Sequence, residues 1–241
     1  WWFCQIVIAH EDVTVSNAST FNDNLFLPSI YIHYSGPKIN YSFSAMSYSN
    51  TIKKYRVELT GLEKIYKMML IEILPETHGV EISIEYATVN NFTGKPIYQK
   101  AACYLHPEAE ALLRRAVSLA EALSLKLRVF DAFRPSEAQW VLWGHTPDPN
   151  FLADPHRGSP HSRAAAVDLT LMNSNGQALE MGTTFDSFTS RSHHGNMEIS
   201  PDAQRNRALL MGIMTSAGWD FYRNEWWHYQ LFNAQRLPLL S

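Results

Sequence analysis

The segment NEWWHYQL, residues 224–231, predicts the last strand of a sheet and, at the same place, a chemical site. Two tryptophans separate a glutamate from a histidine that follows it by three positions. Aromatic side chains are typical of buried strands, but a carboxylate is costly to bury unless it is paired or bound to a metal. Two interpretations follow. The segment is either a buried strand that carries two polar residues, or an active site in which indoles enclose a metal ligand and a proton carrier.

The segments before this strand predict alternating strands and helices from about residue 68 onward. Period-2 and period-3.6 patterns of apolar residues separate the two kinds of element. Strands are expected at 80–88, 125–133, 164–171 and 226–232, and helices at 106–123, 135–143 and 201–218. The helices are too few and too unevenly spaced for a doubly wound sheet. We therefore expect an α+β fold with a mostly antiparallel central sheet and flanking helices.

Two of these elements give explicit predictions about which side chains face the core. Alternation in the strand at 80–88 places four residues on one face, namely Val80, Ile82, Ile84 and Tyr86. Helical spacing in 106–123 places five residues on the inward face of that helix, namely Leu112, Ala116, Leu119, Ala120 and Leu123.

Residues 1–67 differ in composition from the rest of the chain. They are rich in Ser, Asn and Tyr and show no sustained period. Met68 and Met69 stand where the pattern changes, and natural translation is expected to start there. We predict that 1–67 is an atypical extension with little role in function and that 68–241 is the catalytic domain. The alternative is an N-terminal subdomain of irregular strands.

Charge, cysteine content and hydropathy exclude several classes of protein. A formal net charge of −3 gives no electrostatic case for binding nucleic acid. Cys4 and Cys103 are too few for a disulfide framework, so two free thiols and a cytoplasmic location are expected. No apolar run reaches the roughly 20 residues of a membrane span. The alternative location is the periplasm, if a signal peptide is missing or obscured at the N-terminus.

The segment GSPHSRAAAVDLTL, residues 158–171, indicates a metal site together with the last strand. In the strand, Asp168 points away from the apolar face, and His161 lies in the loop that leads into the strand. With His228 from the last strand, these residues offer two imidazoles and one carboxylate. Three protein ligands with a fourth position left for water are typical of catalytic zinc, so one Zn²⁺ per chain is expected. Taken singly, each residue has an ordinary structural interpretation as a hydrogen-bonding histidine or a paired aspartate.

Glu225 precedes His228 by three positions, and in a regular strand two such residues point to opposite faces. Both reach one site only if the backbone turns or bulges where the strand begins. In that case Glu225 would stand beside the activated water without ligating the metal. It would act as the general base and pass a proton to the leaving amine.

Five motifs together resemble the D-alanyl-D-alanine dipeptidases, a family of zinc peptidases: FDAFRP, SPHSRAAAVDLTL, MGTTFD, RSHHG and EWWHY. The resemblance runs from about residue 69 to 231. It implies the zinc D-Ala-D-Ala peptidase architecture, which hedgehog-type modules share. It also implies that His161, Asp168 and His228 are the zinc ligands and that Glu225 is the catalytic base.

The resemblance further implies roles for three residues around the metal, and a fourth is a candidate because of its place beside the ligand loop. Arg134 would stabilise the transition state, although a structural ion pair with Asp131 is the alternative. Asp186 would bind the amino group of the substrate, with Tyr86 nearby. Ser159 is a candidate donor to the substrate carboxylate. The chain departs from the family pattern at two positions: Pro160 replaces a second serine and Phe133 replaces a tyrosine.

The other histidines are expected outside the metal shell. His193 and His194, in RSHHG, match a family pair that does not ligate zinc, and His145 and His156 lie in a loop-like segment and should be exposed.

The expected function is zinc-dependent hydrolysis of D-alanyl-D-alanine to two D-alanines, in cell-wall precursor turnover or glycopeptide resistance. The partner is a small dipeptide, not a nucleic acid or a membrane, and the oligomeric state is left open. Trp226 and Trp227 would wall the site and strengthen its electrostatics. The alternatives are a D,D-carboxypeptidase or peptidoglycan endopeptidase on the same scaffold, and a non-catalytic hedgehog-type zinc domain. A catalytic base and an arginine, Glu225 and Arg134, argue against the non-catalytic domain.

Overall fold

The computed structural model describes residues 14–18, 29–33 and 70–240. The chain divides into two units, Trp1–Lys64 and Ile65–Ser241. In the first unit, β1 (Thr14–Ala18) pairs antiparallel with β2 (Ser29–His33). The rest of the proposed extension 1–67 lies outside the described residues, as do Cys4 and the proposed start at 68–69.

The second unit contains a five-stranded sheet in the order β4-β6-β7-β9-β8. Its strands are β4 (Glu81–Ile82), β6 (Lys126–Asp131), β7 (Ala166–Met172), β9 (His228–Gln230) and β8 (Asp220–Phe221). β4 runs parallel to β6, and the other neighbouring pairs in this sheet are antiparallel. A separate two-stranded sheet joins β3 (Ile71–Glu72) to β5 (Tyr104–Leu105). The α+β class is confirmed, and the central sheet is mixed because of the parallel pair.

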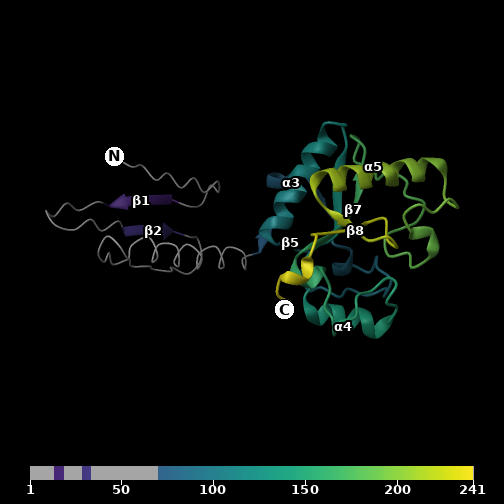
Figure 1. Ribbon diagram of the computed structural model, residues 1–241, viewed down its shortest axis with the longest axis horizontal. Coiled ribbons are helices and arrows are strands. Elements are labelled where there is room, and N and C mark those ends of the chain that lie inside the picture. The colour runs from purple at the N-terminus through teal and green to yellow at the C-terminus, as the bar shows by residue number, and fades with distance from the viewer. Residues whose placement is uncertain (1–13, 19–28, 34–69, 241) are drawn as a thin grey trace. The chain divides into compact units, whose positions relative to one another are not determined.

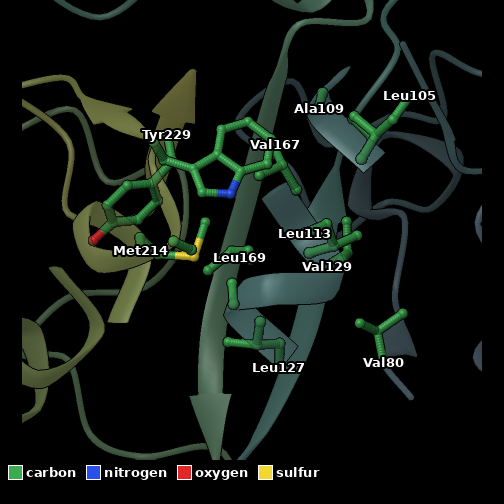
Figure 2. Packing of buried hydrophobic residues seen from close by; sticks show 14 of the residues in the cluster. Val80, Leu105, Ala109, Leu113, Leu127, Val129, Val167, Leu169, Met214 and Tyr229 are labelled. Carbon is green, nitrogen blue, oxygen red and sulfur yellow. The ribbon is translucent and has the colours of Figure 1, made fainter. Parts of the chain in front are cut away.

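β7 is the central strand, and all of its residues are buried. Val167, Leu169 and Leu171 belong to the main hydrophobic core, which includes side chains from β6, β9, α3 and α5. Figure 2 shows Val167 and Leu169 on β7 among these residues. Asp168 and Thr170 alternate with them and therefore point to the other face of the sheet. One strand thus supplies the core on one side and the polar site on the other.

Two long helices, α3 (Pro107–Glu121) and α5 (Pro201–Ala217), pack against each other beside the sheet (Figure 1). Both begin with proline at the first position, where the missing N–H is not needed. The side chains of His106 and Ser200 cap the two N-termini. α5 ends at Gly218, whose φ of 108° is in the region that favours glycine. The shorter helices are α2 (Pro75–His78) and α4 (Ser136–His145).

β6 contains an irregularity where it approaches the site. The pairing with β7 shifts between Val129 and Asp131, so that Asp131 lies opposite Asp168. Such a bulge redirects the side chains that follow it. Asp131 is fully buried as a result, next to the residues that the sequence predicts as metal ligands.

The predicted strand at 80–88 is wrong over most of its length. Only Glu81–Ile82 form a strand, and Glu85–Ala87 form the 3-10 helix η1. Val80, Ile84 and Tyr86 are nevertheless buried, as the alternation predicts. The 3-10 turn sends Tyr86 toward Asp186, so the departure from regular pairing has a consequence for the site.

The predicted inward face of α3 is partly wrong. Leu119 and Leu123 are exposed, whereas Leu113 and Val117 are buried in the core. Ala116 and Ala120 are buried as predicted, and together with Ala109 they show that the buried face is shifted toward Leu113 and Val117.

Cys103 is a buried free thiol, as predicted. None of the helices between residues 70 and 240 is long and apolar enough to cross a membrane.

Candidate active site

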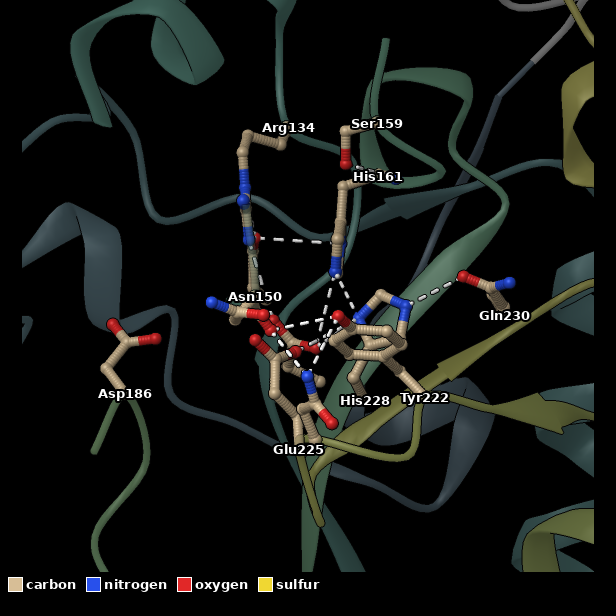
Figure 3. A network of polar contacts seen from close by, with 12 residues as sticks. Arg134, Asn150, Ser159, His161, Asp186, Tyr222, Glu225, His228 and Gln230 are labelled. Carbon is tan, nitrogen blue, oxygen red and sulfur yellow. Dashed lines mark hydrogen bonds and ion pairs between the residues drawn. The ribbon is translucent and has the colours of Figure 1, made fainter. Parts of the chain in front are cut away.

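The three predicted ligands come together from neighbouring elements. His161 opens the 3-10 helix η2 (His161–Arg163) just before β7, and Asp168 and His228 are direct cross-strand partners on β7 and β9. Nε2 of His161 lies 3.3 Å from Oδ1 of Asp168, and Nδ1 of His228 lies 3.0 Å from the same oxygen. All three side chains are buried, and one ligand atom from each lies within 4.8 Å of the others. Figure 3 shows the two imidazoles converging on one point.

Each of the two imidazoles has a hydrogen-bond acceptor outside the cluster. Nδ1 of His161 lies 2.7 Å from the carbonyl of Ala132, and Nε2 of His228 lies 3.0 Å from Oε1 of Gln230. Both oxygens are acceptors, so they can take the single proton of each neutral ring. In that tautomer the nitrogens that face each other, 3.1 Å apart, carry lone pairs. Two lone pairs and a carboxylate oxygen directed at one point fit a cation, and the outer hydrogen bonds are those that orient metal-binding histidines.

Glu225 reaches the same site because the chain turns before β9. β9 starts only at His228, and the N–H of Glu225 donates to the carbonyl of Tyr222 in the turn that precedes it. Oε2 of Glu225 lies 3.9 Å from Nδ1 of His228, beside the ligand cluster. Burial, together with the Asp168 and Asp186 carboxylates, raises the pKa of Glu225 well above its usual range. A cation in the cluster would act in the opposite direction.

Arg134 makes the structural ion pair and also faces the cluster. Its Nε and Nη2 donate to Oδ2 of Asp131 at 2.9 and 2.7 Å, and its Nη2 lies 3.6 Å from Oδ2 of Asp168. Nη1 donates to Gln139, and the guanidinium lies 4.9 Å from the centre of the Tyr86 ring. The structural ion pair and the catalytic role of Arg134 are thus compatible, because Asp131 holds the guanidinium in place next to the predicted metal ligands.

Asp186 and Tyr86 form a second polar position. The hydroxyl of Tyr86 donates to Oδ1 of Asp186 at 3.1 Å. Oδ2 of Asp186 is buried without a hydrogen-bond partner among the described residues. Burial, followed by the charge of Asp168, raises the pKa of Asp186 well above its usual range. No residue between 70 and 240 forms an ion pair with this carboxylate, and Figure 3 shows it apart from the ligand cluster.

Ser159 is buried beside the ligand loop, and its hydroxyl oxygen accepts the backbone N–H of His161 at 3.1 Å. The hydroxyl proton is left for another acceptor. Pro160 follows directly and offers neither a side-chain hydroxyl nor a backbone N–H.

The other histidines lie away from the ligand cluster. His145 and His156 are exposed, as predicted. His194 packs edge-on against Phe221, and burial followed by the charge of Arg207 lowers its pKa to about 4. His193 contacts the ring of Phe151. These contacts are structural.

Both tryptophans of EWWH are buried in the core. Trp227 packs edge-on against Phe185 at 5.5 Å, and Phe185 contacts Tyr86 in turn. Trp226 donates its indole N–H to Thr183 at 2.8 Å. The indoles thus support the aromatic residues and the loop around Asp186.

Sequence reasoning missed several residues that hold the site together. Tyr98 donates to Asp131 at 2.7 Å, Gln139 accepts from Arg134 and donates to the carbonyl of Ala153, and Gln230 orients His228. Gln230 carries a usable signal, because it shares a strand face with His228. Tyr98 and Gln139 lie in segments with no such pattern.

The segment between α4 and η2 contacts two other segments of the site. The carbonyl of Asn150 accepts hydrogen bonds from the Tyr222 hydroxyl at 2.9 Å and from the Asn224 amide at 3.1 Å (Figure 3). The ring of Phe151 stacks on Phe188, two residues beyond Asp186. The segment therefore contacts both the turn that carries Glu225 and the loop that carries Asp186.

Residues 68–238 match the family model described as D-ala-D-ala dipeptidase, Peptidase_M15. The chain is 45% identical to a D-alanyl-D-alanine dipeptidase of Escherichia coli K12, over 71% of this chain and 89% of that protein. It is 34% identical to D-alanyl-D-alanine dipeptidases of Enterococcus faecalis, over 65% of this chain and 88% of that protein, and of Enterococcus faecium, over 64% and 87%.

Proposed function

The chain belongs to the D-Ala-D-Ala dipeptidase family of metallopeptidases, and we propose that it hydrolyses free D-alanyl-D-alanine to two D-alanines with one zinc ion per chain. The observation that carries this proposal is the convergence of His161, Asp168 and His228 on one point, with Glu225 and Arg134 beside it.

Zinc fits the donor set better than other common metals. Magnesium and calcium prefer ligand sets made of oxygen, whereas two neutral imidazoles and one carboxylate are a ligand set of catalytic zinc. His161, Asp168 and His228 would hold the ion. When bound, zinc supplies a Lewis acid that polarises the peptide carbonyl and lowers the pKa of water.

Glu225 is the general base in this proposal. Its carboxylate stands near the ligand cluster without a hydrogen bond to any ligand, which leaves it free to accept a proton from the attacking water. The same carboxyl group then delivers that proton to the nitrogen of the leaving D-alanine. Its burial excludes competing solvent from the transfer.

Arg134 stabilises the negative charge that develops on the carbonyl oxygen during attack. Asp131 and Gln139 fix its guanidinium before substrate arrives, so little reorganisation is needed in the transition state. Its distance from Asp168 places the positive charge next to the reacting position.

Asp186 binds the ammonium group of the substrate, and Tyr86 orients it. Oδ2 of Asp186 has no other partner in the described part of the chain, and a substrate ammonium would supply the missing positive charge. Ser159 donates its hydroxyl proton to the substrate carboxylate. The substrate is then held at both ends, as a dipeptide requires.

Burial supports a small free substrate over a polymer. The five central residues, Arg134, His161, Asp168, Glu225 and His228, are each at most 7% exposed. A carboxypeptidase or endopeptidase acting on peptidoglycan needs an accessible cleft for a long chain.

The test is hydrolysis of D-Ala-D-Ala by the full chain, compared with L-Ala-L-Ala and N-acetyl-D-Ala-D-Ala, with and without a chelator. We expect activity on the free D,D-dipeptide alone and its loss on chelation. Equal activity on the acetylated peptide would favour the carboxypeptidase.

A further inference from the structure

Arg207, on α5, is a buried cation with no role in the proposed reaction. It is 4% exposed and forms no ion pair with a carboxylate within residues 70–240. Burial, together with the nearby Arg191, lowers its pKa to about 10, which leaves the guanidinium charged at neutral pH. A buried charge without a counter-ion is costly unless other polar groups compensate it. The groups that accept hydrogen bonds from Arg207 therefore indicate its structural role.

The guanidinium closes the loop that carries Asp186. Nε donates to the carbonyl of Met181 at 2.6 Å, at the start of this loop. Nη1 donates to the carbonyls of Arg191 and His193 at 2.8 and 3.2 Å, at its end. One side chain thus holds both ends of the segment 181–193 together. The planar fork of arginine suits this arrangement, since its donors point in fixed and different directions.

A chain of hydroxyl groups continues from Arg207 into the loop. Nη2 of Arg207 and the indole N–H of Trp226 both donate to Oγ1 of Thr183, at 3.4 and 2.8 Å. Ser192 donates to the carbonyl of Ser187, so the contact between Thr183 and Ser192 takes its proton from Thr183. These hydrogen bonds connect Trp226, next to Glu225, with Ser187, next to Asp186.

Asp186 depends on its loop being held. Its φ of 59° lies in the left-handed region, which is uncommon outside glycine even though aspartate adopts it more readily than most residues. A residue stays in this conformation only when its surroundings hold it there. If the loop were no longer held, Asp186 could leave the left-handed conformation, and its carboxylate would move away from its present position.

We propose that Arg207 is a positioning residue for recognition of the substrate's amino group. It sets the place of Asp186 relative to the turn that carries Glu225, and it acts through the loop without touching substrate. This inference rests on the proposed function, in which Asp186 binds the ammonium group.

The experiment compares kcat/KM for D-Ala-D-Ala with kcat/KM for N-acetyl-D-Ala-D-Ala in the full chain, with bound zinc measured in parallel. In Arg207→Met, we expect this ratio to fall by about 10- to 100-fold, the size of effect that small misplacements produce. The fall should come mainly from a higher KM for the free dipeptide, and zinc should stay bound. Arg207→Lys keeps the charge but loses the fork, so its ratio should be intermediate.

Arg205→Met is the matched control, because Arg205 lies on the same helix but is exposed, and its one ion pair in the described part of the chain is with Asp202. Its ratio should equal that of wild type. If Arg207→Met does not fold, Arg207→Lys and Thr183→Val give the same test, because Thr183→Val removes the shared hydroxyl. Both should lower the ratio.

A double-mutant cycle with Asp186→Ala separates this role from general stabilisation. If Arg207 acts through Asp186, Arg207→Lys should not change the ratio further once Asp186 is alanine. A ratio that stays at the wild-type value in every Arg207 and Thr183 variant, with both substrates slowed equally, would overturn the inference and leave the proposed function intact. A wild-type ratio near one would instead overturn the proposed function and this inference with it.

Discussion

Nε2 of His161 and Nδ1 of His228 lie 3.1 Å apart, and each ring has an acceptor oxygen outside the cluster for its single proton. When both protons lie on those outer nitrogens, the two inner lone pairs repel each other. The carboxylate of Asp168, close to both nitrogens, adds negative charge to the same place. A bound cation converts this repulsion into ligation, so the polar arrangement and the proposed metal explain each other.

Replacement of His161 should remove the metal. His161→Ala deletes one of three ligands, and two ligands alone hold zinc poorly. Metal analysis of the purified variant should show less than one zinc per chain and no hydrolysis. The control is His156→Ala, which removes an exposed imidazole. Full zinc content in His161→Ala would contradict the assignment of the ligands.

Replacement of Gln230 should weaken metal binding without removing a ligand. In Gln230→Ala, Nε2 of His228 loses its acceptor, and the ring is free to rotate or change tautomer. The loss of such an outer hydrogen bond typically costs about 10- to 100-fold in metal affinity. Competition with a chromogenic chelator measures this change. An unchanged affinity would mean that other contacts orient His228.

Replacement of Glu225 should separate metal binding from catalysis. Glu225→Ala removes the proposed base but no ligand, so zinc should stay bound while kcat falls by about 10²- to 10⁴-fold. Glu198→Ala, at an exposed glutamate, should leave both quantities unchanged. Joint loss of zinc and activity would make Glu225 a ligand instead of a base.

The sequence predicts the parts of this fold that repeat a regular pattern. β7 follows from the alternation of apolar residues around Asp168, and α5 follows from the helical spacing of its apolar residues and from the glycine after its last residue. The same regularity predicts that Glu225 and His228 share a site only if the backbone turns or bulges where the strand begins, and residues 226–227 form such a turn.

Other features depend on tertiary contacts that no local pattern encodes. The strand at 80–88 gives way to a 3-10 turn that carries Tyr86, which bonds Asp186 one hundred positions later in the chain. The bulge in β6 that buries Asp131 leaves no trace in the alternation of its neighbours. Arg207 resembles any other arginine on an amphipathic helix, and only its contacts show that it closes a loop.

A chain that starts at Met69 should fold and bind zinc. The composition changes near this position, and the family match covers residues 68–238. Thermal unfolding, metal content and kcat/KM of the shortened chain should equal those of the full chain. An insoluble or inactive product would show that residues before Met69 stabilise the catalytic unit.

The selectivity for a free amino terminus should depend on Asp186. Acetylation removes the ammonium charge, adds bulk and leaves Oδ2 of Asp186 without its partner. Breaking a buried ion pair costs roughly 3–5 kcal/mol, which corresponds to roughly two to four powers of ten in kcat/KM. Wild type should therefore cleave D-Ala-D-Ala faster than N-acetyl-D-Ala-D-Ala by a factor in this range.

Asp186→Ala should bring kcat/KM for D-Ala-D-Ala closer to kcat/KM for N-acetyl-D-Ala-D-Ala while zinc stays bound, because the variant no longer offers the free amine a counter-charge. Most of the change should be a loss of kcat/KM on the free dipeptide, since the acetylated peptide gains nothing from the carboxylate. Tyr86→Phe is the graded control: it removes only the hydroxyl that orients Oδ1, so its ratio of the two kcat/KM values should lie between those of wild type and Asp186→Ala. If Asp186→Ala slows both substrates equally, the carboxylate serves the loop and not the amine, and the anchor must be sought elsewhere.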